Sequence, residues 1–151
     1  MDRASLTSEV SSWISGSNNG YFITLNTINK DKISFEQDLS KIAHKLNDYV
    51  YGRNYRRNFK RLKIIAGIET GKENGILHAH LVVAHQGETN RQLFDINCYL
   101  RRHWYKLIGL NDYDGSMVNI QKIGDSDSRI TYILKDTKYW LRNDNLNIIV
   151  L

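Results

Sequence analysis

Two histidines two residues apart are the first residues of this sequence whose types and spacing suggest chemistry. They are His78 and His80, within the otherwise apolar run GILHAHLVV at residues 75–83. Side chains alternate between the two faces of a strand, so both imidazoles share one face while the apolar side chains share the other. Such a pair is either the polar face of a half-buried strand or part of a metal site, and the sequence around it must decide between them.

The preceding strand offers a third ligand. The dipeptide Asn74–Gly75 favours a two-residue type I′ turn, and that turn would place Glu69 directly opposite His80. The same register also pairs apolar residues on the other face: Ile68 with Leu81, and Ala66 with Val83. A shift by one residue pair would set Glu69 against His78 instead. A one-residue bulge would break this pairing. With Glu69 in register, a metal site is favoured over a merely polar strand face.

This ligand set indicates a catalytic type of metal site. Two imidazoles and one carboxylate from adjacent strands occupy half of an octahedron and leave positions open for water and a substrate oxygen. With no thiolate and one hard oxygen ligand, Mn²⁺ or Mg²⁺ suits the site, and zinc is possible on grounds of affinity. Such an ion would polarise a phosphodiester oxygen. The sequence therefore predicts a divalent metal bound by Glu69, His78 and His80.

A tyrosine near the C-terminal end of the chain is the candidate nucleophile. At about 100° per residue, a helix over Ser126–Trp140 would place its apolar residues on one stripe and Tyr132, Lys135 and Tyr139 on the other. A phenol has a pKa near 10 and becomes a useful nucleophile when a metal or a cation assists it. Lys135, one turn from Tyr132, could supply that charge. Both tyrosines could equally be rim residues of an amphipathic helix.

Positive charge is concentrated in one segment, RNYRRNFKRLK, at residues 53–63. Cations follow a phosphate backbone, and aromatic rings stack on unpaired bases, so this composition suits single-stranded nucleic acid. A solvated basic loop is the alternative. The candidate DNA-binding residues are Arg53, Tyr55, Arg56, Arg57, Lys60, Arg61 and Lys63, with Phe59 interleaved among them.

The pattern of apolar residues predicts the elements that position these groups. Strands are expected over residues 21–27, 62–69, 76–84, 117–123 and 145–151, the last as an edge strand or a docked tail. Helices are expected from Ser34 to Gly52, from a capping box at Thr89–Gln92 to Gly109, and over Ser126–Trp140. Residues 1–19 are expected to form a loosely held arm. The order β-α-β-β-α-β predicts an α+β fold with a split βαβ, ferredoxin-like antiparallel sheet and helices on one face.

Length and composition exclude several classes of protein. At 151 residues the chain is one domain, and it contains no apolar run near the roughly 18 residues that a membrane span needs. The N-terminus lacks an apolar signal core, so a cytoplasmic protein is expected. The single cysteine, Cys98, cannot form an internal disulfide. No GxxxxGK[ST] loop is present, so no nucleotide cofactor is expected.

Three blocks taken in order resemble a known family. YFITLNT at residues 21–27, Glu69 with LHAHLVV, and Tyr132–Lys135 look like motifs I, II and III of the HUH-type rolling-circle replication initiators (Rep endonucleases) of small plasmids and single-stranded DNA viruses. The resemblance implies a five-stranded sheet with a ferredoxin-like core, and metal-dependent nicking of one strand at a replication origin. It implies Glu69, His78 and His80 as metal ligands, Tyr132 as the nucleophile that forms a 5′-phosphotyrosine ester, and Lys135 as its partner.

The resemblance also implies partners. Single-stranded origin DNA, with or without an adjacent hairpin, would be the substrate, and a host helicase and polymerase would complete replication. Tyr139 would be a second nucleophile or a neighbour that stacks on DNA, while Thr24 and Asn26 are candidates for lining the site. Two alternatives stay open: a single-strand transposase or relaxase with the same chemistry, and a non-catalytic module that binds single-stranded nucleic acid.

Overall fold

A computed structural model describes most of the chain. The described residues are Ser5, Ser8 and Ser12 together with residues 20–28, 31–57, 60–71, 73–85, 91–111, 117–123 and 148–150. The predicted helix over Ser126–Trp140 and most of the predicted arm lie outside these residues. None of the helices in these ranges is both long and apolar enough to cross a membrane.

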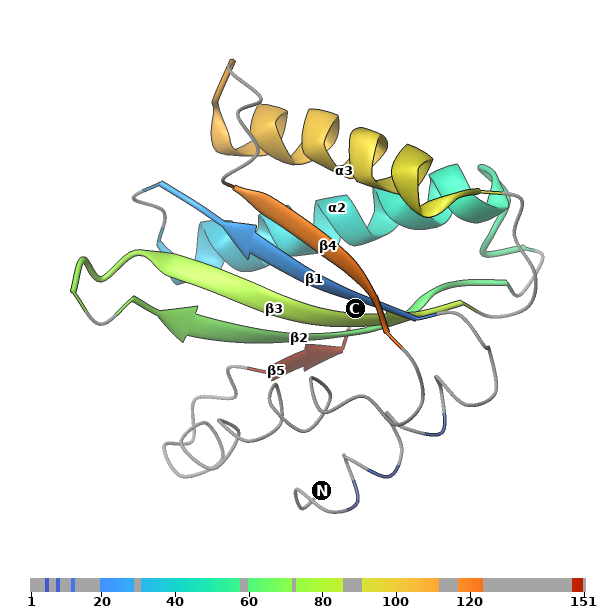
Figure 1. Ribbon diagram of the computed structural model, residues 1–151, viewed down its shortest axis with the longest axis horizontal. Helices are drawn as coiled ribbons and strands as arrows, with labels where there is room; N and C mark the ends of the chain where they lie inside the picture. Colours follow the sequence, from blue (N-terminus) through green and yellow to red (C-terminus); the bar gives the residue numbers. More distant parts are fainter. Residues whose placement is uncertain are drawn as a thin grey trace.

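An antiparallel sheet forms the centre of the fold (Figure 1). Its neighbouring strands follow the order β4-β1-β3-β2, and the short β5 pairs with the outer edge of β2. The strands are β1 (Gly20–Asn26), β2 (Lys63–Thr70), β3 (Leu77–Ala84), β4 (Val118–Ile123) and β5 (Ile148–Val150). β1 and β2 both pair with β3, which inserts between them and creates the split βαβ arrangement.

Two helices, α2 (Lys32–Tyr51) and α3 (Leu93–Ile108), lie on the same face of this sheet (Figure 1). The predicted α+β class and antiparallel sheet are therefore confirmed, and the arrangement is compatible with a ferredoxin-like fold. The core lies between the helices and the sheet, where alternate strand residues such as Ile23, Leu25 and Leu81 meet Phe35 and Trp104. All five of these side chains are at most 1% exposed, so burial of apolar surface holds the helices against the sheet.

Helix α2 begins earlier than its sequence pattern predicts. The expected start was Ser34, whereas the N-cap is Asp31, whose carboxylate accepts hydrogen bonds from the backbone nitrogen and the hydroxyl of Ser34, both at 2.9 Å. The helix ends at Gly52 as predicted, with φ of 88°, a conformation that favours glycine.

Helix α3 ends as predicted at Gly109, in the left-handed conformation with φ of 80°. Its start differs from the expected capping box, because the N-cap is Gln92, which makes no side-chain capping hydrogen bond. Thr89 and Asn90 lie outside the described residues.

The register of the β2–β3 hairpin differs from the prediction. Glu69 lies opposite His78, and His80 lies opposite Gly67, so the strands are shifted by one residue pair from the expected arrangement.

The cause of this shift is a loop between β2 and β3 that is longer than the predicted turn. The Gly71 nitrogen donates to the Ile76 carbonyl at 2.8 Å, so four residues lie between Gly71 and Ile76, and the Gly75 nitrogen donates to the Gly71 carbonyl at 2.9 Å. Asn74–Gly75 is therefore part of a four-residue loop, and the predicted type I′ turn is wrong.

The sheet face turned away from α2 and α3 has two zones. Near the β2–β3 loop it carries polar residues in register: Thr24 lies opposite His80, and Asn26 opposite His78. Further along, the same face carries four buried apolar side chains, Phe22, Ile65, Val82 and Ala84. The candidate metal ligands thus occupy the polar end of a face whose other end is apolar.

Candidate metal centre

The three predicted ligands meet at one point. Glu69 Oε2 lies 2.7 Å from His78 Nε2 and 3.4 Å from His80 Nε2. The ligand atoms of all three residues lie within 4.8 Å of one another. The direct cross-strand pairing of Glu69 with His78 explains the shorter distance, and the diagonal position of His80 explains the longer one. The structure thus brings Glu69, His78 and His80 together despite the changed register.

These distances fit a small divalent cation. A metal bound at about 2.1 Å by ligands at right angles separates neighbouring ligand atoms by about 3.0 Å, and a tetrahedral ion separates them by about 3.4 Å. Two of the three separations, 2.7 and 3.4 Å, lie close to these values, and all three lie within 4.8 Å. The shorter one is also a hydrogen-bond distance, so Glu69 can accept a hydrogen bond from His78 or share a metal with it.

Partial exposure of the group suits catalysis. The side chains of His78, Glu69 and His80 are 25%, 21% and 14% exposed, respectively. They are covered enough to be held in place by neighbours, and they are open enough for water or a substrate oxygen to reach a bound ion. A closed structural site would leave no such position.

His80 is positioned by two residues of β1. Thr24 Oγ1 lies 3.1 Å from His80 Nδ1. The Phe22 ring stacks against the imidazole, with centroids 5.6 Å apart and an interplanar angle of 26°. A hydrogen bond at Nδ1 leaves Nε2 as the nitrogen facing Glu69, and such outer partners fix the tautomer and orientation of metal-ligating histidines. Thr24, expected only to line the site, therefore contacts a ligand directly.

Asn26 is held in place from the helix layer. Its backbone carbonyl accepts a hydrogen bond of 2.8 Å from Trp104 Nε1, and its backbone nitrogen donates to the Met117 carbonyl at 2.9 Å. Since Trp104 is completely buried in α3, the end of β1 beside His78 is tied to the core. Sequence reasoning missed both Trp104 and Phe22. The position of Phe22, two residues before Thr24 on the same strand face, was the signal for its contact with His80.

The basic segment lies at the other end of β2. Its last residue, Lys63, begins the strand, and Glu69 is six residues further along, which corresponds to about 20 Å. The side chains of Arg53, Arg56, Arg57, Lys60, Arg61 and Lys63 are exposed. The metal group and the basic segment are thus two separate regions, and a ligand touching both must extend along the sheet.

Tyr55 does not have the exposed position that stacking on a base requires. Its side chain is only 3% exposed, and its hydroxyl lies 2.8 Å from His44 Nδ1 and 3.3 Å from Arg56 Nε. The expectation of a free aromatic face at Tyr55 is therefore wrong: the ring anchors the segment to α2. Phe59 lies outside the described residues, and so do the predicted catalytic residues Tyr132, Lys135 and Tyr139.

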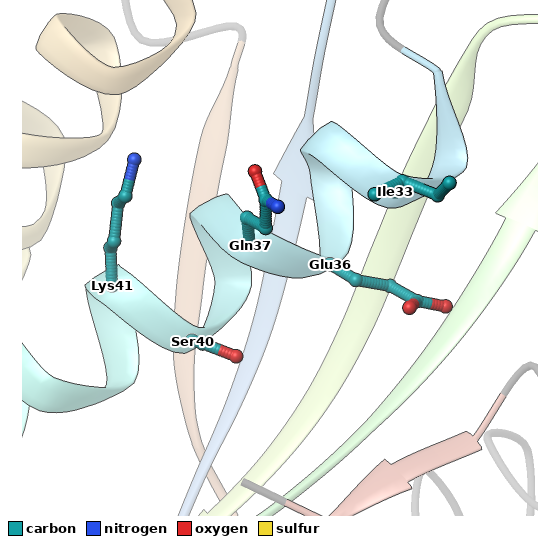
Figure 2. Close-up of a pocket in the computed structure, with 5 residues that line it drawn as sticks. All are labelled: Ile33, Glu36, Gln37, Ser40 and Lys41. Atoms are coloured by element: carbon teal, nitrogen blue, oxygen red, sulfur yellow. The ribbon is translucent and has the colours of Figure 1, made fainter.

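A pocket elsewhere on the protein lacks comparable chemistry. It is an open depression along α2, lined by Ile33, Glu36, Gln37, Ser40 and Lys41 (Figure 2). Glu36 is the one metal-ligating side chain among these five residues. Because α2 packs on the opposite face of the sheet, this depression is separate from the metal centre.

Comparison of the chain with family models, curated proteins and solved structures gives no match. The residues themselves provide a His/His/Glu group that could bind a divalent metal.

Proposed function

We propose that this chain is an HUH-type endonuclease domain that nicks and rejoins single-stranded DNA at a replication origin. The observation that carries the proposal is the meeting of Glu69, His78 and His80 on two adjacent strands of an antiparallel sheet. The resemblance to rolling-circle initiators implies this ligand set on a sheet of this kind. The partial exposure of the three side chains also suits a catalytic site.

Glu69, His78 and His80 would hold the cation that activates the phosphodiester for attack. A divalent cation, Mn²⁺ or Mg²⁺, would polarise a non-bridging phosphodiester oxygen when bound there. His78 and His80 offer Nε2 and Glu69 offers Oε2 as ligands. Thr24 Oγ1 lies at hydrogen-bond distance from His80 Nδ1, and Nε2 would be available to the metal when Nδ1 carries the proton and donates to Thr24. The buried Phe22 restricts rotation of the same ring, so the site is organised before a substrate arrives.

Tyr132 is the proposed nucleophile, by its place in the resemblance. Its phenol oxygen would attack the phosphorus and form a phosphotyrosine ester with the 5′-phosphate of the downstream fragment. The bond from phosphorus to the 3′ oxygen would break, and that oxygen would take a proton to become a free 3′-hydroxyl. Rejoining is the reverse of this cleavage: a 3′-hydroxyl attacks the phosphotyrosine ester and releases the phenol. Lys135 would stabilise the attacking oxygen. Tyr139 is the second candidate for the nucleophile.

The DNA strand would be held along the sheet by the exposed cations of the basic segment. Their distance from the metal group suits a substrate of several nucleotides rather than a single phosphodiester. Unwinding and synthesis would fall to a host helicase and polymerase, in the compartment where the replicon is copied, which is the cytoplasm in a bacterial host.

Covalent capture tests the proposal directly. The protein would be incubated with a pool of single-stranded oligonucleotides and Mn²⁺, and attached DNA would be detected by denaturing electrophoresis and sequenced. We expect an adduct that requires the metal, is abolished by chelation and is lost in Tyr132→Phe.

Tyr139→Phe is the matched control, and we expect it to keep the adduct. Loss of the adduct in Tyr139→Phe but not in Tyr132→Phe would show that the nucleophile is misassigned. No adduct with any oligonucleotide in the presence of Mn²⁺ would favour the non-catalytic binding module. An adduct formed only by a stable dimer would instead favour a transposase.

A further inference from the structure

The two histidines of the metal centre are held in different ways. His80 has partners of its own on β1, because Thr24 lies 3.1 Å from its Nδ1 and the Phe22 ring stacks against it. Within the ranges that the structure describes, the His78 ring contacts Glu69 at 2.7 Å and lies edge-on to the His80 ring, with centroids 5.2 Å apart. Both of these neighbours are ligands themselves, so the place of His78 depends on how its backbone is held.

The backbone of β1 directly opposite His78 bonds to other partners. Asn26 is the residue that pairs with His78. Its nitrogen donates to the Met117 carbonyl at 2.9 Å, and its carbonyl accepts a hydrogen bond of 2.8 Å from Trp104 Nε1. The backbones of Asn26 and His78 therefore form a non-hydrogen-bonded pair of the antiparallel ladder. The contact between the two strands at this point depends on hydrogen bonds made by the flanking residues.

Thr27, the residue that follows β1, makes such a bond. Continued register would place Thr27 opposite Leu77, the first residue of β3. Its hydroxyl donates to the Leu77 carbonyl at 2.6 Å, and its side chain is only 3% exposed, so water cannot replace this bond when it is lost. The Leu77 carbonyl and the His78 nitrogen belong to one planar peptide group. The hydroxyl thus holds the peptide from which the His78 residue begins.

The end of β1 is itself held in place by α3. Trp104, which donates to the Asn26 carbonyl, is completely buried, and its ring packs edge-on against Phe35 of α2 with centroids 6.0 Å apart. Thr27 is the next residue after Asn26, so its main chain starts from a point that is fixed to the helix layer. Its bond to Leu77 extends this restraint from the helix layer to the start of β3.

We propose that Thr27 is a positioning residue of the metal centre, which sets the place of His78 through the Leu77 carbonyl. Alternation from Leu25, which lies in the core, assigns Thr27 to the side of β1 that faces the helices, so Thr27 does not contact the cation. A metal site requires its ligands to be held within about 0.5 Å of the productive geometry. The inference rests on the metal centre of the proposed function and does not depend on the nicking step.

The test compares variants of the full chain that lose one buried hydroxyl each. Thr27→Val removes the donor and Thr27→Ser keeps it. The control, Tyr55→Phe, deletes an equally buried hydroxyl that contacts His44 at the other end of the sheet. Mn²⁺ affinity would be measured by isothermal titration calorimetry, and ligand geometry by the absorption spectrum of bound Co²⁺. We expect Thr27→Val to bind Mn²⁺ about 3- to 10-fold more weakly with a changed Co²⁺ spectrum, and the other two to match the wild type.

Urea unfolding separates this role from a general loss of stability, because Thr27→Val and Tyr55→Phe should both be destabilised while only Thr27→Val loses affinity. Unchanged Mn²⁺ affinity and Co²⁺ spectrum in Thr27→Val would overturn the inference. An equal loss of affinity in Tyr55→Phe or in Thr27→Ser would overturn it as well. A wild type that binds no Mn²⁺ would refute the metal centre and this inference together, whereas metal binding without a DNA adduct would refute the nickase proposal alone.

Discussion

His80 is constrained by three neighbours. Thr24 contacts Nδ1 at 3.1 Å, Phe22 packs against the ring, and Glu69 Oε2 faces Nε2 at 3.4 Å. His78 Nε2 lies 2.7 Å from the same carboxylate oxygen, Glu69 Oε2. A metal bound here would therefore depend on Thr24 for the orientation of one of its two imidazoles.

Replacing Thr24 should weaken the metal site without touching a ligand. Thr24→Val keeps the shape of the side chain but removes the hydroxyl, so we expect Mn²⁺ affinity to fall about 10- to 100-fold. Thr24→Ser keeps the hydroxyl and should stay close to the wild type. Isothermal titration calorimetry of Mn²⁺ binding measures both. Equal affinities for the valine variant and the wild type would show that the contact with His80 has no role in metal binding.

At the scale of elements, strand identity was predictable and strand register was not. Side chains alternate between the two faces of a strand with a period of two. A change of partner by two residues along β3 therefore leaves every apolar residue facing the core. Ile68 can therefore pair with Leu81, as predicted, or with Ala79, as observed, with both pairs apolar. The loop decides between them, and the preference of Asn74–Gly75 for a two-residue turn did not anticipate a four-residue loop.

The start of a helix was also harder to predict from the sequence than its presence. Apolar periodicity located α2, but its first turn contains Lys32 and the exposed Ile33, which do not continue the buried stripe. The cap at Asp31 depends on a local hydrogen bond to Ser34 that periodicity does not report. Gly52 and Gly109 were easier to assign, because a positive φ at a helix end specifically favours glycine.

At the scale of the whole molecule, the sequence predicted which ligands converge but not which side chains of distant elements meet. Glu69, His78 and His80 converge because they lie near one end of adjacent strands, which alternation and a tight connection already imply. The stacked rings of Tyr49 and Tyr99 come from helices far apart in the sequence, and helix packing brings their centroids to 4.1 Å. The burial of Tyr55 also depends on a tertiary contact, with His44.

Stability should fall in acid because of one buried histidine. His85 is 3% exposed and neither ring nitrogen has a hydrogen-bond partner in the described part of the chain. Burial lowers the pKa of His85 from 6.5 to about 4. Below pH 6.5 the unfolded chain binds a proton that the folded chain does not, so this residue destabilises the fold progressively as the pH falls towards 4, by up to about 3 kcal/mol.

Removing that imidazole tests the assignment. Urea unfolding of the wild type and of His85→Leu at pH 7.5 and pH 4.5 should show a smaller loss of unfolding free energy in the variant, because leucine has no proton to gain. Other titrating groups are common to both proteins and cancel in the comparison. The same acid-induced loss in both proteins would mean that His85 does not control this pH dependence.

The central claim is that Glu69, His78 and His80 bind one divalent cation. Anomalous diffraction from a crystal soaked in Mn²⁺ tests it most directly. We predict a single strong peak at about 2.0–2.3 Å from Glu69 Oε2, His78 Nε2 and His80 Nε2. A fully soaked crystal with no peak there, and with Glu69 still hydrogen-bonded to His78, would contradict the claim.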